Sequence, residues 1–119
     1  MSRPKFLVDH DLNEQIVVGV LRGAPAAEFR RVRELGFATR NDAFLLDYAA
    51  GQGLIIVSHD VNTKPAAAYE RLGDGRAVAG LFMVQQTYPV GPIIDQLLLI
   101  WSAIEQEEWA NHVVFLPMR

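Results

Sequence analysis

The chain has 119 residues, half of them hydrophobic, and a formal net charge of −3. We expect residues 1–119 to form a single domain with a substantial core, because this length and composition are those of one ordinary domain. The chain contains no cysteine, which excludes disulfides and thiolate metal sites. The negative charge excludes a molecule that is basic throughout, but it is compatible with a local basic patch.

Two further features favour an intracellular, cytoplasmic protein. The first five residues lead directly into a short apolar run and do not resemble the core of a signal peptide. No apolar run approaches the roughly 20 residues that are needed to span a bilayer. We therefore expect no contact with a membrane.

The N-terminal part of the chain is predicted to form a strand, a helix and a second strand. Residues 5–9 form the first apolar run, and residues 12–22 carry apolar side chains at the three-to-four spacing of a helix. We expect either Asp11 or Asn13 to cap that helix. Residues 28–35 alternate loosely between apolar and basic side chains, which predicts a short, partly exposed strand, with a helical turn as the alternative.

The middle of the chain contains the strongest strand signal. A helix is expected over residues 43–50 and is followed by glycines. Residues 54–58 then begin with four apolar residues, mostly β-branched, without polar alternation. This pattern is typical of a strand that is buried on both faces, as in parallel sheets covered by helices. A short helix over residues 63–72 and an apolar strand over residues 77–84 are expected next.

The C-terminal part completes the alternation of strands and helices. Residues 88–92 contain two prolines and a glycine and predict a turn. Residues 93–109 predict the longest helix, and residues 112–116 the last strand. Alternating elements of this kind favour βαβ units with right-handed crossovers. We therefore expect an α/β fold, a three-layer sandwich with a mostly parallel sheet of four or five strands.

Four aspartates stand at places where ligands gather in such folds. Asp9 ends the first predicted strand, Asp11 follows two residues later, and Asp60 follows the strand at residues 54–58. Open α/β sheets bind ligands outside the carboxyl ends of their strands. Asp42 marks a helix start, and it shares this edge only if residues 28–35 form a parallel strand.

Clustered carboxylates repel one another, and a hard divalent cation relieves the repulsion. Mg²⁺ prefers oxygen ligands, and it can activate a bound water and stabilise charge on a phosphate. The sequence thus predicts a site for Mg²⁺ or Mn²⁺ that could hydrolyse a phosphodiester. Each carboxylate has a plainer alternative: Asp11 and Asp42 as helix caps, Asp9 and Asp60 as turn formers.

Three neighbours of these aspartates have weaker functional signals. Ser58 could orient a carboxylate or a bound water, and a strand-end hydrogen bond is its simpler role. His10 and His59 are expected to point to the opposite strand face from the adjacent carboxylates, and we therefore do not expect them to bind the metal.

Basic residues cluster in the second predicted strand and before the next helix. They could contact a phosphate backbone, although such runs are usually solvated faces. The candidates for nucleic-acid binding are Arg30, Arg31, Arg33 and Arg40.

In the order of these motifs, residues 6–116 resemble the small PIN-like nuclease domains of prokaryotic toxin–antitoxin systems. The first strand of that family ends Asp-Glu-Asn, matched here by Asp9-His10-Asp11, and its Arg-rich strand ending Leu-Gly is matched by residues 29–36. An aspartate at the next helix start is matched by Asp42. A strand ending Thr-x-Asp-x-Asp is matched by residues 58–62. The chain departs from the family at His10 and Asp11, and at Asn62, where a further aspartate is common.

The resemblance implies a PIN-like ribonuclease that depends on Mg²⁺ or Mn²⁺ and acts as the toxin of a type II toxin–antitoxin pair. Its substrate would be RNA, and its partner an antitoxin protein that neutralises it. The carboxylates expected to converge on one cation, and the residues expected to support them, are Asp9, Asp42, Asp60 and Asp11, with Ser58 and Asn62.

Two other functions remain open at this stage. A receiver-like signalling domain also has strand-end aspartates and Mg²⁺, but it needs a lysine after a late strand. The lysines here are Lys5 and Lys64, and neither is placed for that role by the predicted elements. A catalytically inactive PIN-like fold kept as a binding module is the other alternative, because Asn62 stands where a carboxylate is common.

The aromatic residues near the longest predicted helix suggest an interface. The large aromatic side chains in this region are more than a small monomer needs to cover its core; they are Tyr88, Trp101 and Trp109. Aromatic residues are also enriched at interfaces. We expect either a homodimer or an antitoxin contact there, with packing of all three in the core as the alternative.

Overall fold

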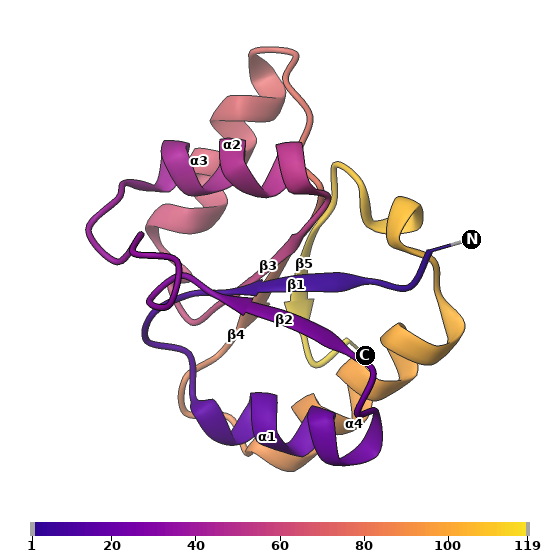
Figure 1. Cartoon of the computed structure of the whole chain (residues 1–119). Coiled ribbons are helices and arrows are strands. Elements are labelled where there is room, and N and C mark those ends of the chain that lie inside the picture. The colour runs from indigo at the N-terminus through magenta and orange to yellow at the C-terminus, as the bar shows by residue number, and fades with distance from the viewer. Residues whose placement is uncertain (1, 119) are drawn as a thin grey trace.

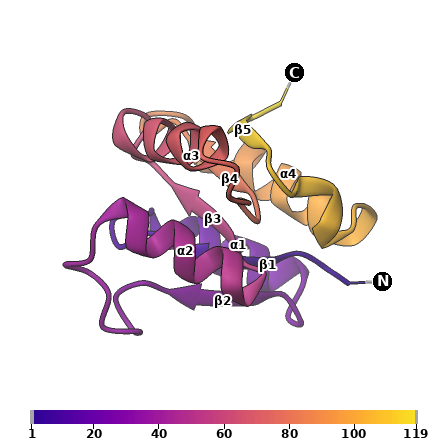
Figure 2. The same ribbon diagram turned by 90° about the horizontal axis from the view of Figure 1, so that it is seen from above.

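The computed structural model describes residues 2–118, which form one five-stranded sheet with two α-helices on each face (Figure 1). All neighbouring strands are parallel, and their order is β2-β1-β3-β4-β5, with β2 and β5 at the two edges (Figure 2). This confirms the expected three-layer α/β fold. The strands are β1 (Lys5–Val8), β2 (Glu28–Arg31), β3 (Ile55–Ser58), β4 (Leu81–Val84) and β5 (Val113–Leu116).

The helices cover the sheet in two pairs. Helices α1 (Glu14–Gly23) and α4 (Val90–Ala103) lie on one face. Helices α2 (Asp42–Gln52) and α3 (Thr63–Gly73) lie on the other (Figure 1). Within residues 2–118, no helix is long and apolar enough to cross a bilayer.

The central strands are apolar apart from Ser58 at the end of β3, because both of their faces are covered. On β3, Ile55 and Val57 pack in the layer of α1 and α4, whereas Ile56 packs in the layer of α2 and α3. All four residues of β3 are buried, as are all four of β4. Each buried aliphatic side chain contributes roughly 1.5–3 kcal/mol to folding. The unbroken apolar runs of the sequence thus follow from a parallel sheet between two helical layers.

Two predicted strands are shorter than expected. The strand expected over residues 28–35 ends at Arg31, and Leu35 N then donates to Arg31 O in a turn. The strand prediction is therefore correct for the first half of this segment, and the helical-turn alternative describes the second half. The strand expected from residue 77 begins only at Leu81.

The bounds of α4 differ from the predicted helix at both ends. The helix begins at Val90, inside the segment predicted to be a turn, with Pro92 in its first turn. Proline is tolerated there because the N–H groups of the first turn have no intrahelical acceptor. The helix ends at Ala103, Ile104 is extended, and a separate 3₁₀ helix, η1 (Gln106–Trp109), follows.

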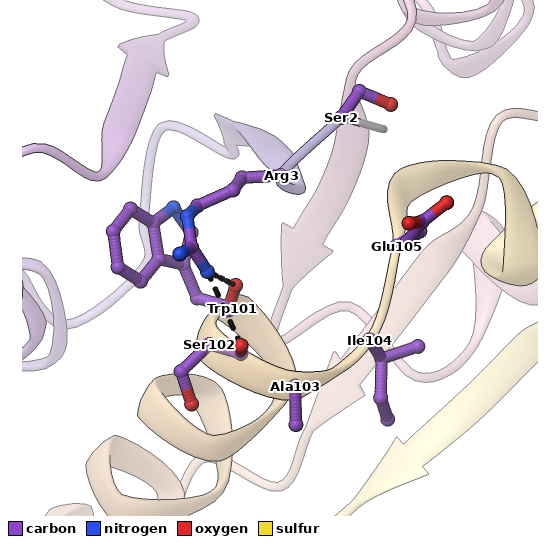
Figure 3. Close-up of a pocket in the computed structure, with 7 residues that line it drawn as sticks. All are labelled: Ser2, Arg3, Trp101, Ser102, Ala103, Ile104 and Glu105. Atoms are coloured by element: carbon purple, nitrogen blue, oxygen red, sulfur yellow. Dashed lines mark hydrogen bonds between the residues drawn. The ribbon is translucent and has the colours of Figure 1, made fainter.

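Arg3 fixes the C-terminal end of α4. Its guanidinium stacks on the ring of Trp101, 4.5 Å from the ring centroid, and donates to Trp101 O at 3.1 Å and Ser102 O at 3.2 Å (Figure 3). These carbonyls belong to the last turn of the helix, where a cation interacts favourably with the helix dipole. The N-terminal segment therefore helps to end α4 where it does.

The aromatic residues proposed for an interface are packed within the monomer. Trp109 is buried, and its ring meets Phe82 edge-on with the centroids 4.9 Å apart. Tyr88 and Trp101 are half-buried and pack against the layer of α1 and α4. The core-packing alternative thus accounts for these side chains, and they give no support to a dimer contact.

Candidate active site

The strand order places a crevice at the carboxyl ends of β1 and β3. The chain runs outward from β1 to β2 on one side and continues through β3 to β5 on the other. Doubly wound sheets bind their ligands at such a topological switch point. Asp9 directly follows β1, and Ser58 ends β3. The two strand ends singled out in the sequence therefore meet at the switch point.

Asp42 reaches the same edge because β2 is parallel to β1. The condition set for Asp42, that a parallel strand lies within residues 28–35, is therefore met. The cap of α2 is Asn41, whose side chain accepts from Phe44 N at 2.8 Å. Asp42 is thus not needed as the cap, and its carboxylate is free to face the crevice.

An open hollow of about 310 Å³ lies at this edge, and all four predicted carboxylates line it. They do not form one cluster, because the group of close ligand atoms found among the described residues contains Asp9 and Asp11 but neither Asp42 nor Asp60. Asp9 is buried, Asp42 and Asp60 are half-buried, and Asp11 is exposed. Lys64 and Arg40 also line the hollow.

Lys64 is the functional candidate that the sequence argument missed. Its Nζ lies 2.7 Å from Asp42 Oδ1 and 3.1 Å from Asp9 Oδ2, and only 5% of its side chain is exposed. From sequence, Lys64 was considered only for the late-strand position of a receiver domain, which it does not occupy, and not as a partner of these carboxylates. A signal was present, because a lysine in the first turn of a helix opposes the helix dipole unless it has acidic partners nearby.

Asp9 is held by donors on both oxygens. Ser58 Oγ donates to Oδ2 at 2.6 Å, and His10 N donates to Oδ1 at 3.0 Å. Burial alone would raise the pKa of Asp9, but the Ser58 hydrogen bond and the charge of Lys64 outweigh it and lower the pKa below its usual value. Asp9 is therefore a buried carboxylate that stays ionised. Ser58 orients it and also accepts from Asp60 N at 3.0 Å, so both the functional role and the simpler strand-end hydrogen bond are present.

Lys64 is the cationic counterpart of this buried charge. Burial acts to lower the pKa of Lys64, but the hydrogen bond to Asp42 and the charge of Asp9 raise it above its usual value. The ammonium is thus charged and pairs with both carboxylates. A pair of carboxylates that shares one cation is the central feature of this site.

Asp60 is directed towards the start of α3. Its carboxylate accepts from Thr63 N at 3.0 Å, from Asn62 N at 3.2 Å and from the Thr63 hydroxyl. The hydrogen bonds from Thr63 lower the pKa of Asp60. Its plainer role as a turn former therefore holds, and its role as a metal ligand stays a prediction. Asn62 is exposed, and its side chain makes no capping bond to α3.

His10 and Asp11 lie on the other side of Asp9. Possible ligand atoms of Asp9, His10 and Asp11 all lie within 4.8 Å of one another. His10 Nδ1 is 3.4 Å from Asp9 Oδ1, so the expectation that His10 points away from Asp9 was wrong. The alternation of a strand no longer applies there, because both residues follow β1. Asp11 does not cap α1, since Asn13 accepts from Gln15 N.

His59 has a structural role that uses both ring nitrogens. Nδ1 lies 2.9 Å from Val84 O, and Nε2 accepts from Asn13 N at 3.1 Å. Because Nε2 accepts from a backbone N–H, Nδ1 is the nitrogen placed to donate to Val84 O. The imidazole thus joins the ends of β3 and β4 to the start of α1, and neither nitrogen is free for a metal.

The four candidate arginines do not form one patch. Arg31 pairs with Glu14 at 2.7 Å, and Arg30 lies 3.4 Å from Glu28. Arg33 donates to His10 O at 3.2 Å, and Arg40 lies over the Phe44 ring and lines the hollow. Arg33 and Arg40 are therefore the two that stand beside the acidic site.

The residues present fit a hard divalent cation. Asp9 Oδ2 and Asp42 Oδ1 already converge on one positive charge, that of Lys64. Carboxylate oxygens in a polar hollow open to water suit Mg²⁺ or Mn²⁺, which keep several water ligands. A second possible position lies on the opposite side of Asp9, beside His10 and Asp11.

Comparison of the chain with protein-family models, with curated proteins and with solved structures found no match. The function is therefore inferred from the geometry of the hollow and from the resemblance in motif order. Substitution of single residues can test the geometry.

Proposed function

We propose that the protein is a metal-dependent ribonuclease whose cation is held by Asp9 and Asp42. The observation that carries this proposal is the convergence of both carboxylates on one cationic position at the switch point of the sheet. The polar hollow beside it is open to solvent, as hydrolysis of a polymer requires. The resemblance to PIN-like nucleases supports the same reaction.

The protein groups have distinct tasks in this proposal. Ser58 and the backbone N–H of His10 hold the Asp9 carboxylate ionised and oriented. Asp42 supplies the second oxygen. Mg²⁺ or Mn²⁺ would activate a water for attack on the phosphodiester and stabilise the developing charge. Arg33 and Arg40 stand where they could hold the phosphates of an RNA strand beside the metal.

The biological setting follows from the resemblance alone. We propose that the protein is the toxin of a toxin–antitoxin pair in the cytoplasm and that a protein antitoxin blocks the hollow. Expression of the chain in bacteria should then arrest growth, and Asp9→Asn should abolish the arrest. Co-expression of the neighbouring reading frame should relieve it, whereas growth arrest that survives Asp9→Asn would contradict the proposal.

Cleavage of labelled oligonucleotides tests the enzyme directly. We expect wild-type protein with Mg²⁺ or Mn²⁺ to cleave single-stranded RNA, and EDTA or Asp9→Asn to abolish cleavage. Asp74→Asn is a matched control, because Asp74 is exposed beyond the far end of α3 and pairs only weakly with Arg76 at 3.6 Å. Cleavage of DNA but not RNA would change the substrate class, and equal activity of Asp9→Asn would refute the mechanism.

The presence of Lys64 in the site favours one second candidate, a catalytically inactive PIN-like module that binds RNA. In that case the ammonium would permanently neutralise Asp9 and Asp42. Such a module would bind RNA but would not cleave it in the presence of any divalent metal ion. The receiver alternative is less favoured, because Lys64 comes from the start of α3 and not from a late strand. A lack of phosphorylation by small phosphoryl donors would exclude it.

A further inference from the structure

Lys64 occupies the position that a metal bridging Asp9 and Asp42 would need. Its ammonium contacts both oxygens at hydrogen-bond distance, and the side chain is almost wholly buried. Mg²⁺ binds carboxylate oxygens at about 2.0–2.1 Å, which is shorter than either contact of Nζ. A cation between these two oxygens therefore cannot coexist with the ammonium in its present place.

We propose that Lys64 is a built-in competitor of the metal, which holds Asp9 and Asp42 together in the metal-free protein and leaves both when a divalent cation binds between them. This inference rests on the proposed function and concerns the control of the same site. It implies that the metal-free site is stable and preformed. It also implies that the affinity for metal is lower than two converging carboxylates would otherwise give.

The charges at the site favour such an exchange. Without a cation, the buried Asp9 and its neighbour Asp42 would repel each other, and an uncompensated buried charge is strongly destabilising. The ammonium removes that penalty. When a divalent cation takes its place, the like charges of metal and ammonium would drive Lys64 away.

The released side chain has a place to go. Lys64 extends from the first turn of α3 into the open hollow, whose wall includes the half-buried Asp60. The charge of Lys64 already contributes to the lowered pKa of Asp60. Rotation of the Lys64 side chain along this wall would direct the ammonium towards Asp60, and α3 would stay folded.

A metal could instead bind on the other side of Asp9, beside His10 and Asp11. Lys64 would then stay in place and hold Asp9 for the metal. The two arrangements predict opposite effects of removing the ammonium. In the first, metal binding becomes tighter, and in the second, it is unchanged or weaker.

The experiment compares Lys64→Met with Lys5→Met by calorimetric titration with Mn²⁺ and by thermal unfolding without metal. Lys5 is the matched control, because it is the other lysine of the chain and stands at the amino end of β1, away from the hollow. We expect Lys64→Met to melt at a lower temperature without metal and to bind Mn²⁺ at least about tenfold more tightly than wild type. Lys5→Met should bind Mn²⁺ as wild type does.

The outcomes separate this inference from the proposed function. Wild-type protein that binds Mn²⁺ and cleaves RNA, with unchanged or weaker binding by Lys64→Met, would overturn the inference alone. Binding by Lys64→Met but not by wild type would support the inference and refute the nuclease. Absence of binding by both would refute both.

A loss of folding in Lys64→Met would still be informative. If the variant folds only when Mn²⁺ is added, as followed by circular dichroism, the metal has replaced the ammonium, and the inference is supported. If it stays unfolded at saturating Mn²⁺, the metal cannot take the place of the ammonium, and the inference is overturned.

Discussion

At the scale of single residues, Asp9 and Asp60 illustrate two roles for aspartates that both follow buried strands. Asp9 is buried and faces Lys64, whereas Asp60 is half-buried and accepts three hydrogen bonds at the start of α3. The sequence identified both positions, because each ends an apolar run. It could not distinguish them, since the difference lies in the direction of the side chain and in the donors it meets.

The role of Asp60 predicts the effect of Asp60→Asn on stability. The amide keeps one acceptor oxygen for Thr63 N but loses the charge that favours a helix N-terminus. We expect the free energy of unfolding to fall by roughly 0.5–1 kcal/mol, measured by urea denaturation without metal. Removal of carboxylate repulsion by the same substitution would act in the opposite direction. A variant more stable than wild type would show that repulsion dominates after all.

The hydrogen bond from Ser58 to Asp9 predicts that the free energy of unfolding falls as the pH is lowered into the acid range. The folded pKa of Asp9 is lowered, so its contribution is present above the unfolded value of about 3.9 and is lost as pH falls through the folded pKa. Ser58→Ala should bring the folded pKa of Asp9 closer to the unfolded value. We expect lower stability at pH 7 and a shallower loss between about pH 5 and pH 2. Urea denaturation across this range measures both, and parallel curves for the two proteins would contradict the assignment.

At the scale of elements, the order of strands and helices was predicted correctly, whereas the bounds of β2, β4 and α4 were wrong by three residues or more. Residues 54–58 could be assigned from local pattern alone, because a run that is apolar on both faces has few other folded environments. The end of α4 could not, since Ile104 and Trp109 continue the apolar spacing of the helix. The contacts of Arg3 with the last turn of α4 come from the other end of the chain, and Lys64 likewise meets partners remote in sequence. Local patterns carry no information on such contacts.

The packing of α1 on α4 depends on a close approach at Gly19. A Cβ at this position would overlap the side chain of Ile94 on α4. Alanine in a helix is favoured over glycine by about 0.5–1 kcal/mol, but overpacking typically costs about 1–3 kcal/mol. We therefore expect Gly19→Ala to lower the free energy of unfolding by roughly 1 kcal/mol.

Gly51 in α2 provides the matched control for that prediction. A Cβ there meets no atom within 4 Å, so Gly51→Ala gains helix propensity without a clash. Thermal unfolding should rank Gly51→Ala above wild type and Gly19→Ala below it. Equal stabilisation by both substitutions would mean that Ile94 moves aside at no cost.

At the scale of the whole molecule, topology brings together residues that are far apart in sequence. A parallel β2 was needed to place Asp42 beside Asp9, and the strand order places both at the switch point. The alternation of elements made this edge predictable. Neighbouring residues of a strand face opposite layers, but the partner that each arginine meets there could not be predicted, because it depends on how the helices pack on the sheet. Arg31 therefore pairs with Glu14 of α1, while Arg30 reaches Gln52 of α2.

This distribution predicts a weak dependence of RNA binding on salt. Only Arg33 and Arg40 of the four candidates stand beside the hollow, and the protein as a whole is acidic. Each phosphate neutralised on a single strand contributes about −0.7 to the slope of log K against log salt concentration. Fluorescence anisotropy with labelled RNA in EDTA should therefore give a slope of about −1 to −2.

Single substitutions locate the origin of that slope. Arg33→Gln and Arg40→Gln should each make it shallower by roughly 0.7, because each removes one phosphate contact. Arg31→Gln is the matched control and should leave the slope unchanged, since Glu14 already neutralises this guanidinium at 2.7 Å. A slope near −5, or a clear effect of Arg31→Gln, would mean that RNA breaks the ion pairs of β2 and crosses a wider surface than the hollow. In that case β2 itself, and not only the carboxyl edge of the sheet, would be part of the binding face.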